Sequence, residues 1–375
     1  MMTRRDRLMR TLRGETVDRP AVSFYEVGGF KIDPLDSDPF NIYNDPSWQP
    51  LLELTVEQTD LIRMCPPRVR CAHNPYQKRE VFEKGGSRFT RTTLETGGRT
   101  LTSLTRHDPD VNTIWTLEHL LKDVDDLEAF LKLPDEVLGE EVDVSNLEEE
   151  DRLIEERGIV MVDTEDPLCA AAGLFSMENY TMIAFSEPET FHQLLEKLAR
   201  VVHRRTEIVA REFPGHLWRI YGPEYASAPF LPTRMFEEYV VRYTGPMVRM
   251  IQAHGGFARI HCHGRIRDLL PHFVGMGADA TDPIEPPPQG DIELAEVRRD
   301  YGRQLVLFGN IEITDIENLP PAQFEKVVAR TLRDGTAGEG RGFVMLPSAA
   351  PYGRTITPRT LENYQTMVRL ANSGI

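Results

Sequence analysis

The chain has 375 residues, of which 40% are hydrophobic, and a formal net charge of −16 at pH 7. This size suits one large packed domain or two ordinary ones. The acidic balance argues against nucleic acid or an anionic membrane as a partner, because both attract clustered lysine and arginine. No apolar run approaches the roughly 20 residues that cross a bilayer. The N-terminus has no apolar signal core either, so we expect a cytoplasmic protein.

The first part of the chain combines single helices and strands with a β-rich segment. A helix is expected from Arg4 to Leu12, and Gly14 closes it. Ala21 to Tyr25 and Thr59 to Met64 are candidate strands. A run of β-rich segments then predicts an antiparallel insertion at about 79–116, formed by residues 79–82, 88–96, 99–105 and 111–115. The acidic run 140–151 is most simply a solvated helix face or loop.

From Gly158 onwards, short apolar strands alternate with helical segments. Six further strands are expected at residues 158–163, 216–221, 257–261, 278–282, 304–308 and 342–346. Strands separated by helices imply parallel pairing, and eight of them favour a (β/α)8 TIM barrel over an open sheet. We therefore predict an α/β fold, a TIM barrel with an antiparallel β insertion after the second strand, as a single domain over residues 1–375.

Polar side chains follow most of the predicted barrel strands, at the end where such barrels carry their chemistry. Asp163 and Glu224 are candidate catalytic acids or bases, because a carboxyl group in a partly dry pocket can have a raised pKa. Tyr225, Asp282 and Asn310 are candidate substrate-binding residues. The alternatives are a buried Asp satisfied by loop amides and an Asn that only forms a turn.

A metal site is suggested by His261 and His263. On an extended chain they project to the same face, while Cys262 points to the other. Glu285 follows the next strand and can supply a third ligand, which gives the three-ligand arrangement of catalytic zinc or another divalent metal. The alternatives are histidines bonded to backbone, and a Glu285 that caps a helix or binds an arginine. Four scattered cysteines without a Cys-x-x-Cys pair predict free thiols.

Several segments together resemble the uroporphyrinogen decarboxylase superfamily: residues 13–20, 261–264, 277–280 and 309–311. The resemblance runs from about Arg4 to Leu370 and implies a (β/α)8 barrel. The superfamily contains the decarboxylase and the zinc-dependent, corrinoid-linked methyltransferases. The decarboxylase typically has an arginine-rich segment, an aspartate and a histidine at three places in the chain. The corresponding stretches of this sequence lack them; these stretches are Tyr25 to Phe30, Ile62 to Cys65 and Leu346 to Ala350, respectively.

The methyltransferase branch has His-x-Cys-Gly at the fifth strand, a glutamate one strand later and a cysteine near the last strand. His261, His263 and Glu285 match its first three ligands if His263 takes the cysteine's place, and no cysteine lies near Ala349. The resemblance thus implies a harder nitrogen and oxygen ligand set, suited to oxygen substrates rather than to thiols.

We therefore expect a metal-dependent methyltransferase that moves a methyl group between a corrinoid or methylated small molecule and an acceptor. Expected partners are a small-molecule substrate and a corrinoid-binding protein, and a homodimer is possible. The first alternative is a decarboxylase or lyase on a carboxylated substrate, with Asp163 or Glu224 as proton donor. A hydrolytic barrel is less favoured, and a non-catalytic binding barrel is the alternative from a different class.

Overall fold

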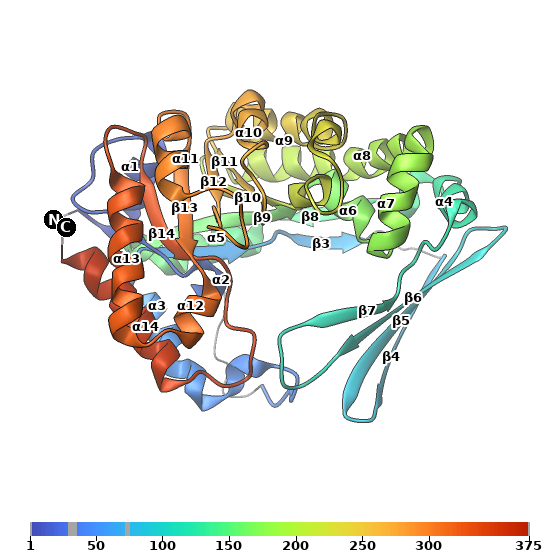
Figure 1. The fold of residues 1–375 in the computed structure, drawn as a ribbon. Helices are drawn as coiled ribbons and strands as arrows, with labels where there is room; N and C mark the ends of the chain where they lie inside the picture. Colours follow the sequence, from blue (N-terminus) through green and yellow to red (C-terminus); the bar gives the residue numbers. More distant parts are fainter. Residues whose placement is uncertain (1, 29–35, 72–75, 374–375) are drawn as a thin grey trace.

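The computed structural model describes residues 2–28, 36–71 and 76–373, so Gly29 and Phe30 of the segment compared above lie outside it. Its centre is an eight-stranded sheet in the order β1-β14-β13-β12-β11-β10-β9-β2, in which every pairing is parallel. The sheet curls into the predicted barrel, with helices around it (Figure 1). Its strands are β1 (Ala21–Val22), β2 (Leu61–Cys65), β9 (Gly158–Glu165), β10 (Leu217–Tyr221), β11 (Phe257–His261), β12 (Ala280–Asp282), β13 (Val306–Ile311) and β14 (Phe343–Pro347).

Helices connect the strands and bury the apolar outer face of the sheet. They are α1 (Arg4–Arg13), α2 (Tyr25–Gly28), α3 (Gln49–Gln58), α4 (Val124–Leu131), α5 (Ser145–Ile154), α6 (Pro167–Ala172), α7 (Met177–Ser186), α8 (Pro188–Glu212), α9 (Arg242–Ala253), α10 (Leu270–Met276), α11 (Leu294–Tyr301), α12 (Ile313–Asn318), α13 (Pro321–Thr336) and α14 (Pro358–Asn372). Gly14 ends α1 in the left-handed conformation (φ 73°), as its position in the sequence predicts. Within the described residues, no helix has the length and apolarity to cross a membrane.

The side chain of Asp60 joins β1 to the segment that leads into β2. The amide of Val22 donates to Oδ2 of Asp60 (3.0 Å), and the Asp60 amide donates to the carbonyl of Val22 (2.8 Å). Two guanidinium groups neutralise the carboxylate, from Arg7 at 2.6 Å and Arg19 at 2.7 Å. Asp60 thus links the two edges of the curled sheet.

The predicted insertion is a four-stranded antiparallel sheet that extends away from the barrel (Figure 1). Its strands are β4 (Gln77–Lys84), β5 (Ser87–Glu95), β6 (Thr100–His107) and β7 (Ile114–Glu118). Leu94 and Leu101 are buried and join the main hydrophobic core, which attaches the sheet to the rest of the molecule. A second small sheet pairs β3 (Arg68–Cys71) with β8 (Glu140–Asp143).

Two local predictions are wrong. The first strand ends at Val22 rather than Tyr25, because Tyr25 begins the helical turn α2. The acidic run 140–151 is partly a strand, since β8 pairs with β3, and only its second half forms the helix α5. That helix buries Leu147 and Ile154 on one face and exposes Glu148 and Glu149 on the other, whereas Glu150 turns toward the barrel and pairs with Arg63.

Candidate active site

A charged network fills the barrel interior at the carboxyl end of β11 and β12. Arg259 and His261 are two residues apart on β11, so both point inward, and the sheet register places His261 beside Asp282. Nε of Arg259 lies 3.0 Å from Oδ1 of Asp282, and Nδ1 of His261 lies 2.8 Å from its Oδ2. The hydroxyl of Tyr25 donates to Oδ2 at 3.2 Å. Both oxygens of the predicted substrate-binding Asp282 therefore contact protein groups.

The same network sets the protonation of His261 and Asp282. Burial, with help from the positive charge of Arg219, lowers the pKa of His261 to about 3, so its imidazole is neutral. Burial alone would raise the pKa of Asp282, but Arg259 and His261 hold it well below its usual range. Asp282 is thus a permanent anion that orients the His261 ring through Nδ1.

Asp163, a predicted catalytic residue, forms a second ion pair in the interior. Nη1 of Arg219, on the neighbouring strand β10, donates to Oδ1 of Asp163 at 2.9 Å. Nη2 of Arg219 also lies 3.6 Å from Oε1 of Glu26. Burial raises the pKa of Asp163, although Arg219 opposes the rise. The structure therefore places Asp163 as the counter-ion of a buried arginine.

Four residues at the carboxyl ends of four neighbouring strands form what we call the rim cluster: Glu224, His263, Glu285 and Glu312. They follow β10, β11, β12 and β13, which are adjacent in the sheet. Nδ1 of His263 lies 2.9 Å from Oε1 of Glu285, and the amide of Gly264 donates to Oε2 of Glu285 at 2.6 Å. The side chain of His263 is 38% exposed, whereas that of Glu285 is 11% exposed. Imidazole is thus the accessible group of this pair.

Two carboxylate oxygens of the rim cluster, Oε2 of Glu224 and Oε1 of Glu312, are buried and have no hydrogen-bond partner among the described residues. The other oxygen of Glu312 accepts a hydrogen bond from Oγ of Ser348 at 3.2 Å. Burial, together with the charge of Glu285, raises the pKa of Glu312 to about 7. Burial also raises the pKa of Glu224, and the charge of His263 opposes both shifts. Glu312 is therefore suited to hold or donate a proton near neutrality.

The electrostatics of His263 and Glu285 favour a charged pair. Burial alone would lower the pKa of His263, but the hydrogen bond and charge of Glu285 raise it above its ordinary value. Burial alone would raise the pKa of Glu285, and His263 lowers it instead. The pair therefore behaves as an imidazolium and a carboxylate between the two shifted pKa values.

The three predicted metal ligands do not form a three-ligand site as they are arranged. Glu285 uses one oxygen on His263 and the other on the amide of Gly264, and His261 is held by Asp282. The two imidazole rings are perpendicular, with centroids 4.6 Å apart. Across residues 2–28, 36–71 and 76–373, no three His, Cys, Asp or Glu side chains are placed to hold one ion. Each imidazole instead contacts a carboxylate, His261 that of Asp282 and His263 that of Glu285.

Tyr225 lies next to Glu224 at the rim, and Asn310 does not. Tyr225 is half-buried, and its carbonyl accepts a hydrogen bond from the hydroxyl of Tyr180 at 2.8 Å. Asn310 faces the outer helix layer, where its Oδ1 accepts from Oγ1 of Thr331 on α13 at 3.2 Å. The roles of both residues in substrate binding remain predictions.

Arg219, Arg259 and Glu312 were not predicted from the sequence. A partial signal for the arginines was present, because a charged residue inside a short apolar strand is buried and needs a counter-ion, although the strand alone does not say on which face. Glu312 directly follows β13, and its position between a strand and a helix was equally visible.

Comparison with known proteins agrees with this architecture. The family model "Uroporphyrinogen decarboxylase (URO-D)" matches residues 124–373, more than half of the chain. No curated protein matches the sequence. Among solved structures, a methyltransferase from Methanosarcina mazei has a TM-score of 0.62 and 13% identity, over 100% of this chain and 99% of that one. At this identity the likeness shows a shared fold. The family match, together with the barrel, establishes that the chain belongs to the uroporphyrinogen decarboxylase family.

Proposed function

We propose that the protein is a methyltransferase that removes a methyl group from the oxygen or nitrogen of a neutral or cationic small molecule. The observation that carries the proposal is a pair of buried carboxylate oxygens, on Glu224 and Glu312, that have no hydrogen-bond partner in the described part of the chain. They follow strands on either side of β11, which leads to the accessible His263 imidazole. The shared fold with a Methanosarcina methyltransferase supports this branch of the family.

Removal of a methyl group from an ether oxygen needs a proton donor beside the leaving atom, whereas a methylammonium group leaves as a neutral amine. When a nucleophile takes the methyl group from a methyl ether, the carbon–oxygen bond breaks and its electron pair stays on oxygen. A proton then converts that oxygen to a hydroxyl group. Glu312, with a pKa of about 7, is protonated often enough to supply this proton and basic enough to be reprotonated from solvent. Glu224 provides a second carboxyl group on the opposite side of His263.

The rim cluster also selects the charge of the substrate. Three of its four side chains are carboxyl groups, so a substrate carboxylate would meet like charge in a poorly solvated site. A hydroxyl, amine or ammonium group would instead satisfy the free oxygens of Glu224 and Glu312. Neutral or cationic methylated substrates are therefore favoured over carboxylated ones.

The methyl acceptor is proposed to come from outside the chain. Burial raises the pKa of the Cys262 thiol well above its ordinary value, and it raises that of Cys169 as well. Neither thiol is therefore available as a thiolate nucleophile. The predicted corrinoid would supply the nucleophile when bound, delivered by a corrinoid-binding protein.

A divalent metal at His261, His263 and Glu285 remains a prediction that the present pairing does not support, and no step above depends on it. Elemental analysis of protein purified without chelators tests it. One equivalent of zinc that is lost in the His261→Ala variant would support the metal site. Metal well below one equivalent would support the histidine–carboxylate pairs.

The second candidate function is decarboxylation, which the family match favours. The carbanion left by loss of carbon dioxide also needs a proton, and Glu312 could donate it. The acidic rim cluster disfavours the carboxylated substrate that this reaction requires.

A matched substrate panel tests the proposal. Methoxyphenol, methylammonium and methoxybenzoate would each be incubated with protein and reduced cobalamin, and methylcobalamin would be followed by absorbance. We expect turnover of the first two and little of the third. Glu312→Gln should lower kcat for methoxyphenol by about 100-fold, because the leaving oxygen loses its proton donor, whereas Glu325→Gln, in an exposed ion pair with Arg369 on the helix layer, should leave it unchanged. Preferred turnover of the carboxylated substrate would overturn the proposal.

A further inference from the structure

We propose that the protein binds a small oxyanion, the phosphate or carboxylate group of a metabolite, at the amino end of the barrel. A cavity of about 350 Å³ lies there, which we call the basal cavity. It is formed by the segment before β1, the segment before β14 and the helices α11, α13 and α14. Because the rim cluster follows the carboxyl ends of the strands, the two sites lie at opposite ends of the barrel.

The group that points to an anion is the guanidinium of Arg298 on α11. Arg298 is only 7% exposed, and its Nε donates to the carbonyl of Ala337 at 2.9 Å. Nη1 is buried and has no hydrogen-bond partner within residues 2–28, 36–71 and 76–373. Burial is the one influence on the pKa of Arg298, which it lowers, and no carboxylate of the described residues raises it. A buried cation without a counter-ion is unfavourable, so the cavity beside it is suited to an anion.

Gly340 holds the guanidinium in this position. A Cβ atom on Gly340 would lie 2.4 Å from both Cζ and Nη1 of Arg298, so any other residue would push the guanidinium aside. The backbone before β14 thus lies directly against the charged group. This close approach fixes Arg298 in the wall of the basal cavity.

The other charged groups of the basal cavity do not neutralise Arg298. Asp18 is bound to Arg7, with 2.7 Å between Oδ1 and Nε. Glu15 is exposed to solvent. Arg19 and Arg341 also line the cavity, and each lies near a carboxylate, Arg19 at 2.7 Å from Asp60 and Arg341 at 3.8 Å from Asp279. Arg298 is thus the arginine of the basal cavity that has no carboxylate partner among the described residues.

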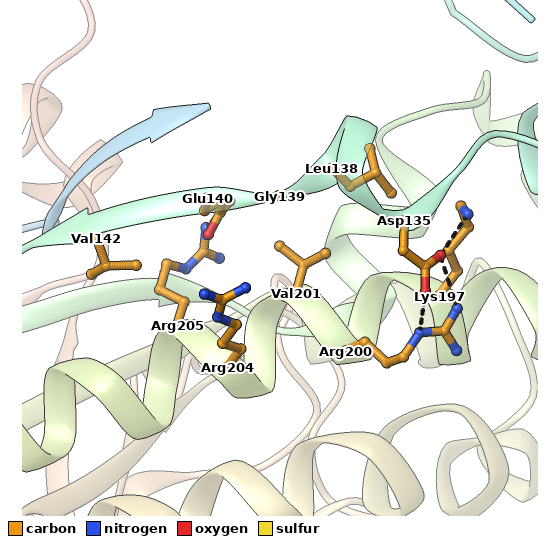
Figure 2. A pocket seen from close by; sticks show the side chains of 10 residues that line it. All are labelled: Asp135, Leu138, Gly139, Glu140, Val142, Lys197, Arg200, Val201, Arg204 and Arg205. Atoms are coloured by element: carbon orange, nitrogen blue, oxygen red, sulfur yellow. Dashed lines mark hydrogen bonds and ion pairs between the residues drawn. The ribbon is translucent and has the colours of Figure 1, made fainter. Parts of the chain in front are cut away.

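A second cavity with basic walls provides a contrast. It measures about 150 Å³ and lies between β8 and α8 (Figure 2). Lys197 and Arg200 both bind Asp135 there, at 2.9 and 3.0 Å, and Arg205 binds Glu140 at 3.0 Å. The buried cations of that cavity already have carboxylate partners, so their charge requires no ligand. The basal cavity differs because Arg298 has no carboxylate partner in the part of the chain that the structure describes.

Inorganic phosphate is the probe for the test. We expect wild-type protein to broaden the ³¹P resonance of phosphate at millimolar concentrations and to gain thermal stability with phosphate relative to chloride at equal ionic strength. Arg298→Met should weaken phosphate binding about tenfold or more, because it removes a charge-assisted hydrogen bond. The control Arg303→Met, whose side chain is 77% exposed, should bind like wild type.

Gly340→Ala provides a second test if Arg298→Met folds poorly, because it displaces the guanidinium and keeps its charge. It should also weaken phosphate binding while the far-UV circular dichroism stays unchanged. The proposal is overturned if wild-type protein shows no phosphate-specific effect, or if both variants bind phosphate as tightly as wild type. Neither result bears on the proposed methyl transfer, since the rim cluster lies at the other end of the barrel.

Discussion

Buried carboxyl groups in this barrel have opposite pKa shifts according to their neighbours. Asp282 touches Arg259 and His261, and these partners outweigh the effect of burial and keep it ionised. Glu312 faces the like charge of Glu285, which adds to the effect of burial and raises the pKa to about 7. One group therefore serves as a fixed anion and the other as a proton donor.

The pH dependence of stability should report the shifted pKa of Glu312. The unfolded chain ionises this group near pH 4.5, whereas the native state keeps the proton until about pH 7. Stability therefore falls as pH rises through this window and stays lower above it. Glu312→Gln should remove this fall and add about 1–3 kcal/mol above pH 7. Urea denaturation from pH 4 to 8 measures it, and an unchanged pH profile would contradict the assignment.

Breaking the interior network should cost far more than breaking an exposed ion pair. Asp282→Asn leaves the fully buried Arg259 without a counter-ion, which should cost about 3–5 kcal/mol in the free energy of unfolding. Glu339→Gln breaks the pair between Arg303 and an 88% exposed glutamate and should change it by less than about 0.5 kcal/mol. Equal effects of the two substitutions on urea denaturation would refute the network's role.

For single residues, the sequence was a better guide to which side chains lie near one another than to which of them form hydrogen-bonded pairs. His263 and Glu285 do meet, because their strands are neighbours and both residues follow the strand ends. The sequence could not reveal that His261 forms a hydrogen bond with Asp282, because that contact depends on the register of β11 and β12. Nor could the sequence reveal that Asn310 faces the outer helix layer, where it accepts a hydrogen bond from Thr331.

The insertion sheet depends on its attachment to the core. Leu101 on β6 is 1% exposed, so Leu101→Ala should destabilise the protein by about 2–5 kcal/mol. Leu117 on β7 is 53% exposed, and Leu117→Ala should change stability by less than about 0.5 kcal/mol. A single cooperative transition in Leu101→Ala would support one domain. A separate early transition of the insertion would show that it unfolds on its own.

Long or strongly patterned elements were predictable, and short ones were not. The bounds of α8 and β11 follow from their apolar spacing and flanking residues. The two-stranded sheet of β3 and β8 was missed because its strands are four residues each and rich in charge. Such strands form through pairing with a distant segment, which local propensity does not encode.

The two ends of the barrel differ in charge. The carboxyl groups of the rim cluster lie at the carboxyl end, whereas Arg298 lies at the amino end and has no counter-ion among the described residues. The barrel itself was predictable because strands and helices alternate. Its closure through Asp60 was not, since that contact joins the edges of the folded sheet.

The fate of an isotopic label tests the central claim most directly. Protein and reduced cobalamin would receive methoxyphenol labelled with ¹³C in the methyl group together with methoxybenzoate labelled in the carboxyl group. We predict that the methyl label appears in methylcobalamin and that the carboxyl label stays in place. Labelled carbon dioxide without labelled methylcobalamin would contradict methyl transfer and assign the rim cluster to decarboxylation.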